Sequence, residues 1–309
     1  MVKRLQNKIS ESRITLPVIA VYAAVIWLAC GLIPNQWWIQ FVCFAVSTYL
    51  MIELNNSNAL IRIYSKMVSS SFLMLSVCCC FLFASLKGAI TEMLLIATYG
   101  LLYKTYQEQE STGKTYYAFL CMGLASLANV HVLYYVPALW MLMGLFLKSL
   151  SVKNILASIL GVLTPYWLGI GYLTYIADYS MLTEHVAKLT AFNALFDFSV
   201  LSLQQIMMLG FTMVLAATGI IHYLNTSFYD KIRIRMMYYC FICMAILTAV
   251  FIVVQPQHYD MLMRMMIINT CPLIAHFMAL TSTRITNIAF CLIVLAILSL
   301  TGYNLWIVL

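Results

Sequence analysis

Charged residues are scarce in this sequence: only 9% of its 309 residues are Asp, Glu, Lys or Arg, whereas 64% are hydrophobic. A soluble globular domain has roughly 25% charged and about 45–50% apolar residues, and its fold cannot bury so large an apolar excess. The polar stretches are short, and none has the composition of a separate soluble domain. We therefore expect residues 1–309 to form a single all-α transmembrane domain, a polytopic helical bundle.

Familiar catalytic and nucleotide-binding motifs are also missing. The chain has no Walker loop, no GxSxG, no HExxH and no dinucleotide fingerprint. The 17 basic residues form no block or stripe, so we expect no nucleic-acid partner. The ten cysteines lie within apolar segments, which favours small apolar side chains over disulfides or metal ligands. We expect no cofactor and no metal.

Long apolar stretches fill most of the chain. A spanning helix needs about 20 mostly apolar residues, and eleven segments approach this length. They are residues 15–33, 37–54, 67–86, 89–103, 117–130, 132–147, 155–175, 203–224, 237–254, 262–280 and 286–308. Asn129, His131 and Pro137 divide residues 117–147, so we interpret that stretch as a helical hairpin. Residues 1–14 then form a basic cytoplasmic segment.

The distribution of basic residues predicts the orientation, because short cytoplasmic loops are enriched in Lys and Arg. If the N-terminus is cytoplasmic, eleven spans place 14 of the 17 basic residues inside and only Lys87, Lys188 and Arg264 outside. One span more or fewer would invert every later loop and destroy this asymmetry. We therefore predict about 11 spans, with the N-terminus cytoplasmic and the C-terminus outside.

The predicted outer side holds most of the candidate chemical groups. Ionisable residues at membrane depth are costly and are functional candidates by default. The candidate catalytic residues are the acids Asp178, Glu184 and Asp260. The candidate substrate-binding residues are His131, His185, His258 and Arg264.

Two outer connections contain most of these residues. In residues 177–202, apolar side chains recur at helical spacing opposite Glu184 and His185, which predicts an amphipathic helix on the outer membrane surface. That helix could equally be a structural lid or scaffold. In residues 255–264, Arg264 at headgroup level can hold a phosphate through bidentate hydrogen bonds, and Asp260 can orient it or act as a base. An ordinary salt bridge with a snorkelling arginine explains the same residues.

Three stretches within residues 58–178 follow one another in a defined order. A basic lead-in to a span, NALIRIYSKMVSSSFLML, precedes the hairpin YYAFLCMGLASLANVHVLYYVPALWMLMGLFL, and ILGVLTPYWLGIGYLTYIAD precedes the predicted outer helix. This order resembles the GT-C superfamily of polytopic membrane glycosyltransferases, and within or near that layout a bacterial family of multi-span membrane proteins. The resemblance implies a GT-C-like layout and the use of polyprenyl-phosphate-linked sugars at the outer face.

The chain departs from the GT-C pattern at its first outer loop. In that superfamily this loop is long and carries the catalytic acid, whereas here it is only Pro34-Asn35-Gln36 and has no carboxylate. No catalytic residue is carried over from it. Either Asp178, Glu184 or Asp260 acts instead, with Glu92 as a further substitute, or the chain is a non-catalytic relative.

Three functions follow as expectations. The first is GT-C-like handling of a polyprenyl-phosphate-linked sugar in cell-envelope glycan assembly, with the chain itself a glycosyltransferase or not. The second is a non-catalytic scaffold subunit of an inner-membrane complex, favoured by the missing acid and by 20 adaptable methionines. The third is a small-molecule or lipid transporter, although the sequence has no clear internal repeat. The expected partners are membrane lipid, including polyprenyl phosphate, and other membrane proteins.

Overall fold

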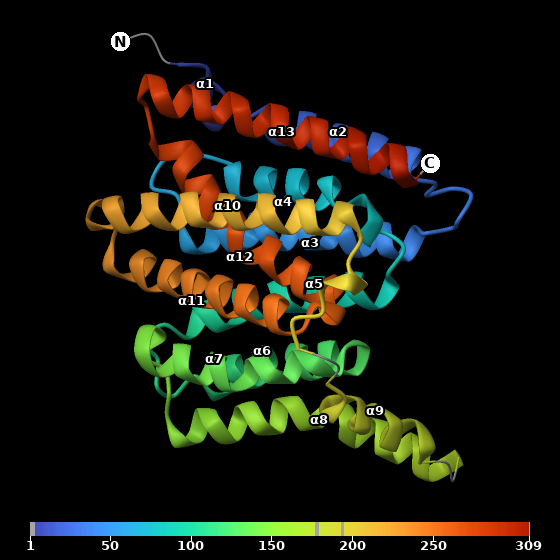
Figure 1. Cartoon of the computed structure of the whole chain (residues 1–309). Coiled ribbons are helices and arrows are strands. Elements are labelled where there is room, and N and C mark those ends of the chain that lie inside the picture. Colours follow the sequence, from blue (N-terminus) through green and yellow to red (C-terminus); the bar gives the residue numbers. More distant parts are fainter. Residues whose placement is uncertain (1–3, 177–178, 193–194, 309) are drawn as a thin grey trace.

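The computed structural model describes residues 4–176, 179–192 and 195–308, and every regular element in these ranges is a helix (Figure 1). The α-helices are α1 (Leu5–Glu11), α2 (Thr15–Ala29), α3 (Trp38–Asn58), α4 (Met67–Cys78), α5 (Leu86–Leu102), α6 (Thr112–Ala128), α7 (Val136–Leu142), α8 (Val152–Ile176), α9 (Ser180–Thr190), α10 (Leu203–Thr226), α11 (Ile232–Val254), α12 (Tyr259–Leu280) and α13 (Arg284–Val308). Short helical turns join or extend them: η1 (Cys80–Leu82), η2 (Tyr103–Thr105), η3 (Val130–Tyr135), η4 (Met143–Leu147), η5 (Phe198–Val200), η6 (Ser227–Tyr229) and η7 (Pro256–His258).

Each of the eleven predicted segments coincides with a helix or, for residues 132–147, with the run η3–α7–η4. Among the described residues, seven helices are long and apolar enough to cross a membrane, or eight if α1 and α2, bent by 86°, form one broken span. Helices α4, α5 and α6 have only 12, 17 and 17 residues, fewer than the roughly 20 that a straight crossing needs. The all-helical fold with several membrane-length helices is confirmed, whereas the count of about 11 spans is not.

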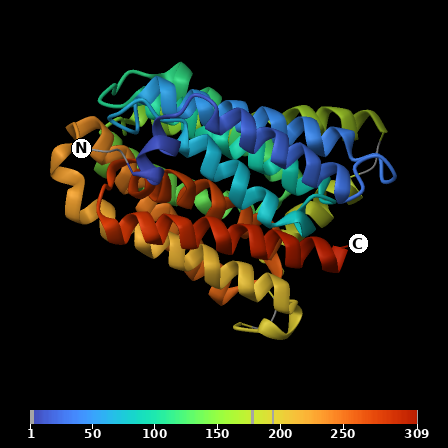
Figure 2. The same cartoon turned by 90° about the horizontal axis from the view of Figure 1, so that it is seen from above.

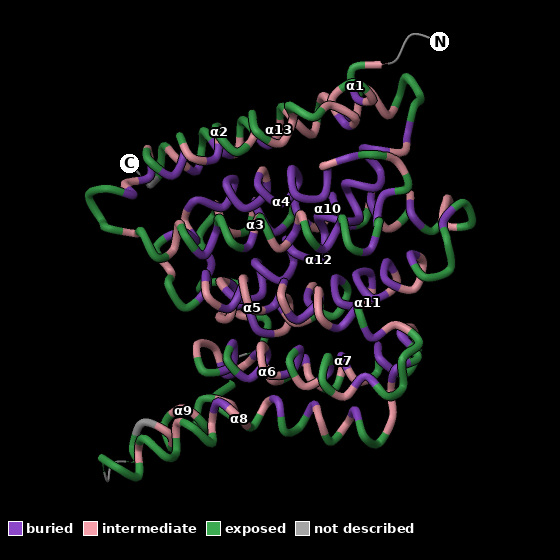
Figure 3. The backbone as a smooth tube through the Cα atoms, turned by 180° about the vertical axis from the view of Figure 1, so that it is seen from behind, coloured by how far each residue is buried: buried purple, intermediate pink, exposed green. Residues whose placement is uncertain are grey.

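Helix α12 lies at the centre of the bundle and packs against α4, α5, α10 and α11 (Figure 3). All of its residues except Asp260 and Leu280 are buried. Flexible methionine side chains, which fill irregular gaps, make up five of its 22 residues. Helices α2, α8 and α13 instead form the outside of the bundle and expose many large apolar side chains, as membrane-facing helices do.

Polar side chains at three depths tie α12 to its neighbours. Near its middle, Asn269 Oδ1 accepts a hydrogen bond from Tyr99 Oη at 2.9 Å. Towards its C-terminal end, His276 Nε2 lies 3.0 Å from Asp230 Oδ2, and both side chains are fully buried. Arg264, near its start, belongs to the cluster described below. These contacts fix the position of α12 along its own axis.

The connections between helices gather at two ends of the bundle. At one end, which we call the basic end, Arg62 approaches Asp230 at 3.7 Å and Gln6 Nε2 donates to Thr281 Oγ1 at 2.6 Å. At the other, which we call the Asp260 end, the connection before α5 bonds to the start of α12. Helix α1 lies at the basic end, and α13 ends at the Asp260 end (Figure 1 and Figure 2). The side of the membrane on which each end lies stays a prediction.

The predicted amphipathic helix over residues 177–202 is shorter in the structure. Helix α9 covers only Ser180–Thr190, and residues 177–178 and 193–194 lie outside the described ranges. Two local hydrogen-bonding patterns interrupt the helix after α9. The Asp197 carboxylate accepts a hydrogen bond from the Ser199 backbone N–H at 3.1 Å, which favours a turn. Ser202 and Gln205 form a capping box that starts α10 there.

Helices α6 and α8 approach each other so closely that their backbones touch. A Cβ atom added at Gly161 of α8 would lie 2.6 Å from the Tyr116 carbonyl oxygen of α6, and one added at Gly123 of α6 would lie 2.7 Å from the Val162 carbonyl oxygen. Small residues allow this approach between helices in membranes. The close packing of α6 and α8 stabilises the hairpin formed by α6 and α7, whose turn lies at the Asp260 end.

We predict that Gly161→Ala destabilises the protein by about 1–3 kcal/mol, because the added methyl group forces the two backbones apart. Gly169→Ala on the same helix is the matched control, since a Cβ there meets nothing within 4 Å and alanine favours helix formation. Thermal unfolding in detergent, followed by size-exclusion chromatography, measures both. Equal melting temperatures for the two variants would contradict the packing described here.

Candidate functional site

Arg264 is the centre of a polar cluster at the Asp260 end. Its side chain is buried, yet its guanidinium is fully engaged: Nη1 donates to Glu92 Oε2 at 2.6 Å, and Nε donates to Asp260 Oδ1 at 3.0 Å. Nη2 donates to the carbonyl oxygen of Leu82. The cluster thus joins one guanidinium to two carboxyl groups and one backbone carbonyl. Arg264 therefore joins α5, η1 and the start of α12.

The N-terminus of α5 contacts this cluster directly. The Ser85 hydroxyl accepts a hydrogen bond from the Gly88 N–H at 3.1 Å and donates one to Asp260 Oδ2 at 2.6 Å. A Cβ atom at Gly88 would lie 2.5 Å from Arg264 Nε and 2.8 Å from Asp260 Oδ2, so any side chain there would displace the ion pair. Asp260 keeps 41% of its side chain exposed, against 6% for Glu92. Asp260 is thus the carboxylate of the cluster that an outside ligand can reach.

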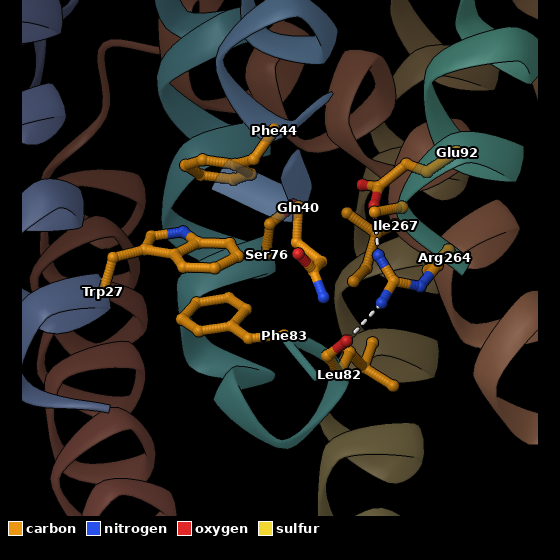
Figure 4. A pocket seen from close by; sticks show the side chains of 10 residues that line it. Trp27, Gln40, Phe44, Ser76, Leu82, Phe83, Glu92, Arg264 and Ile267 are labelled. Atoms are coloured by element: carbon orange, nitrogen blue, oxygen red, sulfur yellow. Dashed lines mark hydrogen bonds and ion pairs between the residues drawn. The ribbon is translucent and has the colours of Figure 1, made fainter. Parts of the chain in front are cut away.

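A cavity of about 20 Å³ lies beside Arg264. It is lined by Trp27, Gln40, Phe44, Ser76, Leu82, Phe83, Ala89, Glu92, Arg264 and Ile267. Figure 4 shows Gln40 between the aromatic side chains and Arg264. Among the described residues, the buried atoms Trp27 Nε1, Ser76 Oγ and Glu92 Oε1 have no hydrogen-bond partner. The volume and polarity of the cavity suit one water molecule or one hydroxyl group. The cavity is too small for a sugar ring.

Two histidines meet at the same end. The ring centroids of His131 in η3 and His258 in η7 lie 3.7 Å apart. The Nε2 atom of each ring is buried and has no hydrogen-bond partner among the described residues. Tyr134 lies beside the His131 ring and Phe251 beside the His258 ring. The pair thus offers two unused imidazole nitrogens to a polar ligand.

An apolar groove between α7 and α11 extends towards this histidine pair, and neither histidine is among its lining residues. It consists of two adjoining hollows of about 290 and 340 Å³, which share Leu247 and Val250. Tyr134 and Phe251, which contact the histidine rings, also line the nearer hollow. An elongated apolar ligand with one polar end fits this arrangement, because its chain can lie in the groove while its polar end meets the imidazoles.

Helix α9 packs over the same region. Tyr134 Oη donates to the carbonyl oxygen of Leu189, and His185 Nε2 lies 3.4 Å from Tyr166 Oη. His185 is also close enough to His131 to act on it electrostatically. Glu184, on the same helix, is exposed. Helix α9 is therefore placed to cover the polar end of a ligand in the groove.

The structure brings the sequence candidates together only in part. Asp260 contacts Arg264, and His131 contacts His258. Among the described residues no hydrogen bond or ion pair joins the exposed Glu184 to either pair, and Asp178 lies outside these residues.

Arg264 was expected as a phosphate ligand. In the structure each of its three guanidinium nitrogens donates a hydrogen bond to a protein acceptor, as in the salt-bridge alternative. The sequence analysis did not predict the ion pair between Arg264 and Glu92. The available signal was that Glu92 is the single acidic residue of α5 and Arg264 the single Lys or Arg of α12.

No group of three His, Cys, Asp or Glu side chains within the described residues is arranged to hold a metal ion. No protein-family model, curated protein or solved structure matches the chain.

We predict that Arg264→Met destabilises the protein by about 3–5 kcal/mol, because it leaves the buried Glu92 carboxylate without its counter-charge. The double variant Glu92→Leu with Arg264→Met should recover much of this loss, since it removes both buried charges. Lys153→Met, which breaks the exposed Lys153–Glu110 pair, is the control and should change little. Melting temperatures in detergent test the series. A double variant as unstable as Arg264→Met would refute the pairing argument.

Proposed function

We propose that this chain is a multi-pass protein of a bacterial inner membrane that handles a polyprenyl-phosphate-linked sugar during cell-envelope glycan assembly. The observation that carries the proposal is the apolar groove between α7 and α11, whose lining residues Tyr134 and Phe251 contact two histidines with unpartnered Nε2 atoms. A polyprenyl phosphate has the matching shape and chemistry: a long apolar chain and one anionic end. The GT-C resemblance of residues 58–178 supplies the reaction class.

In this proposal the isoprenoid chain lies along Leu247 and Val250, and the phosphate accepts hydrogen bonds from His131 and His258. Helix α9 then covers the headgroup. The sugar lies outside the 20 Å³ cavity, which takes at most one of its hydroxyl groups. In this proposal the lipid-linked ligand enters the groove from the membrane.

Asp260 is the proposed general base. Both of its oxygens are already positioned, one by Ser85 and the other by Arg264. The acceptor hydroxyl gives its proton to Asp260 while its oxygen bonds to the anomeric carbon of the sugar. The bond between that carbon and the phosphate oxygen breaks, and polyprenyl phosphate leaves with the electron pair. Asp260 thus substitutes for the acid that the short loop Pro34-Asn35-Gln36 does not supply.

The binding step makes the first prediction of this proposal. A double variant with His131→Asn and His258→Asn should bind polyprenyl phosphate at least about 100-fold more weakly, since each of the two hydrogen bonds to the charged phosphate contributes roughly 1.5–3 kcal/mol. Native mass spectrometry of the detergent-solubilised protein, titrated with a short-chain polyprenyl phosphate, measures this.

The matched ligand control is polyprenol of the same chain length. It lacks the phosphate, so its binding should not respond to the two histidine substitutions. Equal affinities of the wild-type and variant proteins for polyprenyl phosphate would overturn the assignment. Binding that survives, together with glycan assembly that persists in cells after Asp260→Asn and Glu184→Gln, would favour the scaffold function over the enzyme.

The proposal also needs eleven crossings, with the basic end in the cytoplasm and the Asp260 end outside. We predict that alkaline phosphatase fused after the C-terminal residue is active, because this enzyme folds only outside the cytoplasm, whereas fusions at Ser111 and at Ser149 in the basic-end connections are inactive. Green fluorescent protein at the same positions gives the complementary readout. Active phosphatase at Ser149 would place the basic end outside and contradict the orientation.

A further inference from the structure

A second apolar groove lies on the opposite side of the bundle, between α2 and α13. Both helices pack against α4, and residues of α4 line the hollow between them. The hollow measures about 420 Å³, within the range of about 300–1,000 Å³ typical of ligand pockets. Helix α1 closes it at the basic end. This groove has no lining residue in common with the groove between α7 and α11.

The polarity of the lining changes along the groove. At the basic end it has Lys8 in the last turn of α1, Ser12 just after α1, and Ser70 and Ser71 in the first two turns of α4. Deeper in, the lining is apolar and includes Met74, Leu75, Leu215, Val294 and Ile297. A ligand that fills this groove therefore has a polar, negatively charged end near Lys8 and an apolar remainder.

Helix α1 holds Lys8 in place over the groove. Gln6 Nε2 donates to the Met278 carbonyl oxygen at 2.7 Å, and Asn7 Nδ2 donates to the Thr281 carbonyl oxygen at 3.1 Å. The 86° bend between α1 and α2 sets α1 across the groove end. Among the described residues, no carboxylate lies within ion-pair distance of the Lys8 ammonium. Its charge is available to an anion.

Two buried hydroxyl groups point to the same kind of ligand. Ser70 and Ser71 are only 1% and 6% exposed, and their Oγ atoms have no hydrogen-bond partner among the described residues. A buried hydroxyl without a partner is unfavourable, so such groups are normally hydrogen-bonded. An ester carbonyl accepts a hydrogen bond from a serine hydroxyl. Ser71 lies four positions after Met67, the first residue of α4, which corresponds to about 6 Å along the helix. The hydroxyl groups therefore lie a short distance inward from the start of α4.

We propose that this groove binds an anionic glycerophospholipid from the leaflet at the basic end. The phosphate of its headgroup meets Lys8, its ester carbonyls accept hydrogen bonds from Ser70 and Ser71, and one acyl chain lies along Leu75 and Val294. The site is separate from the polyprenyl phosphate groove and does not depend on the proposed function. It would make an anionic lipid a structural component that keeps α2 and α13 apart on α4.

Native mass spectrometry tests this with two probes that share their acyl chains: 1-palmitoyl-2-oleoyl phosphatidylglycerol, which is anionic, and the corresponding phosphatidylcholine, which has no net charge. We expect the wild-type protein to retain phosphatidylglycerol at least about tenfold more strongly. Lys8→Gln should remove this preference, and Ser70→Ala with Ser71→Ala should weaken both lipids. Lys153→Gln, an exposed lysine at the same end, is the matched control and should leave the preference unchanged.

A groove-filling variant, Val294→Trp, keeps the test independent of the headgroup. It should abolish the strongly retained lipid while the protein still elutes as a single species. Equal retention of the two lipids, an unchanged preference in Lys8→Gln, or strong lipid retention in Val294→Trp would each overturn the proposal. A co-purified helical protein segment in place of lipid, displaced by Val294→Trp, would also overturn it.

Discussion

The fold depends on one constraint: the polar side chains in the body of α12 need partners within the protein, because every residue from Met261 to Ala279 is buried. Inside a membrane an unpaired polar or charged group costs several kcal/mol. Arg264, Asn269 and His276 therefore select their neighbours, Glu92 and Tyr99 on α5 and Asp230 after η6. Apolar packing alone could let α12 slide by a residue, whereas three polar contacts at different depths admit a single register.

The same constraint places the candidate site. Arg264 fixes the first turns of α12, and the residues just before that point are His258 and Asp260. Because α12 cannot move along its axis, His258 is held against His131 of the preceding hairpin, and Asp260 is held against Ser85. Arg264 thus positions the groups that face a ligand, and its own guanidinium remains bound to protein. This explains why an arginine that resembles a phosphate ligand in sequence behaves as a positioning residue in the structure.

Hydropathy was enough to locate every long helix, because a run of apolar residues bounded by polar ones has few alternatives in a membrane. It could not decide how many of these helices cross, since α4 ends after 12 residues within an apolar run that a hydropathy reading continues to residue 86. Hydropathy also could not predict which buried polar groups pair with each other. Glu92 and Arg264 are 172 positions apart, and no local pattern joins them. Ser76 and Trp27 gave no signal at all, because a single serine or tryptophan in a span is ordinary.

The two grooves illustrate how a membrane protein can distinguish one lipid from another. An apolar groove is a poor discriminator, because hydrocarbon chains of many lipids fill it with similar free energy. Selectivity must come from the polar atoms at its end, where an unmatched group is costly. The groove between α7 and α11 extends towards imidazole nitrogens that suit an anionic group, whereas the groove between α2 and α13 has an ammonium at its polar end and two hydroxyl groups about one turn into α4. Hydroxyl groups at that depth suit a ligand with ester carbonyls below its phosphate, and an isoprenoid chain attached directly to phosphate has none. The position of the polar atoms along each groove, more than its volume, is therefore the basis on which we propose different lipids for the two sites.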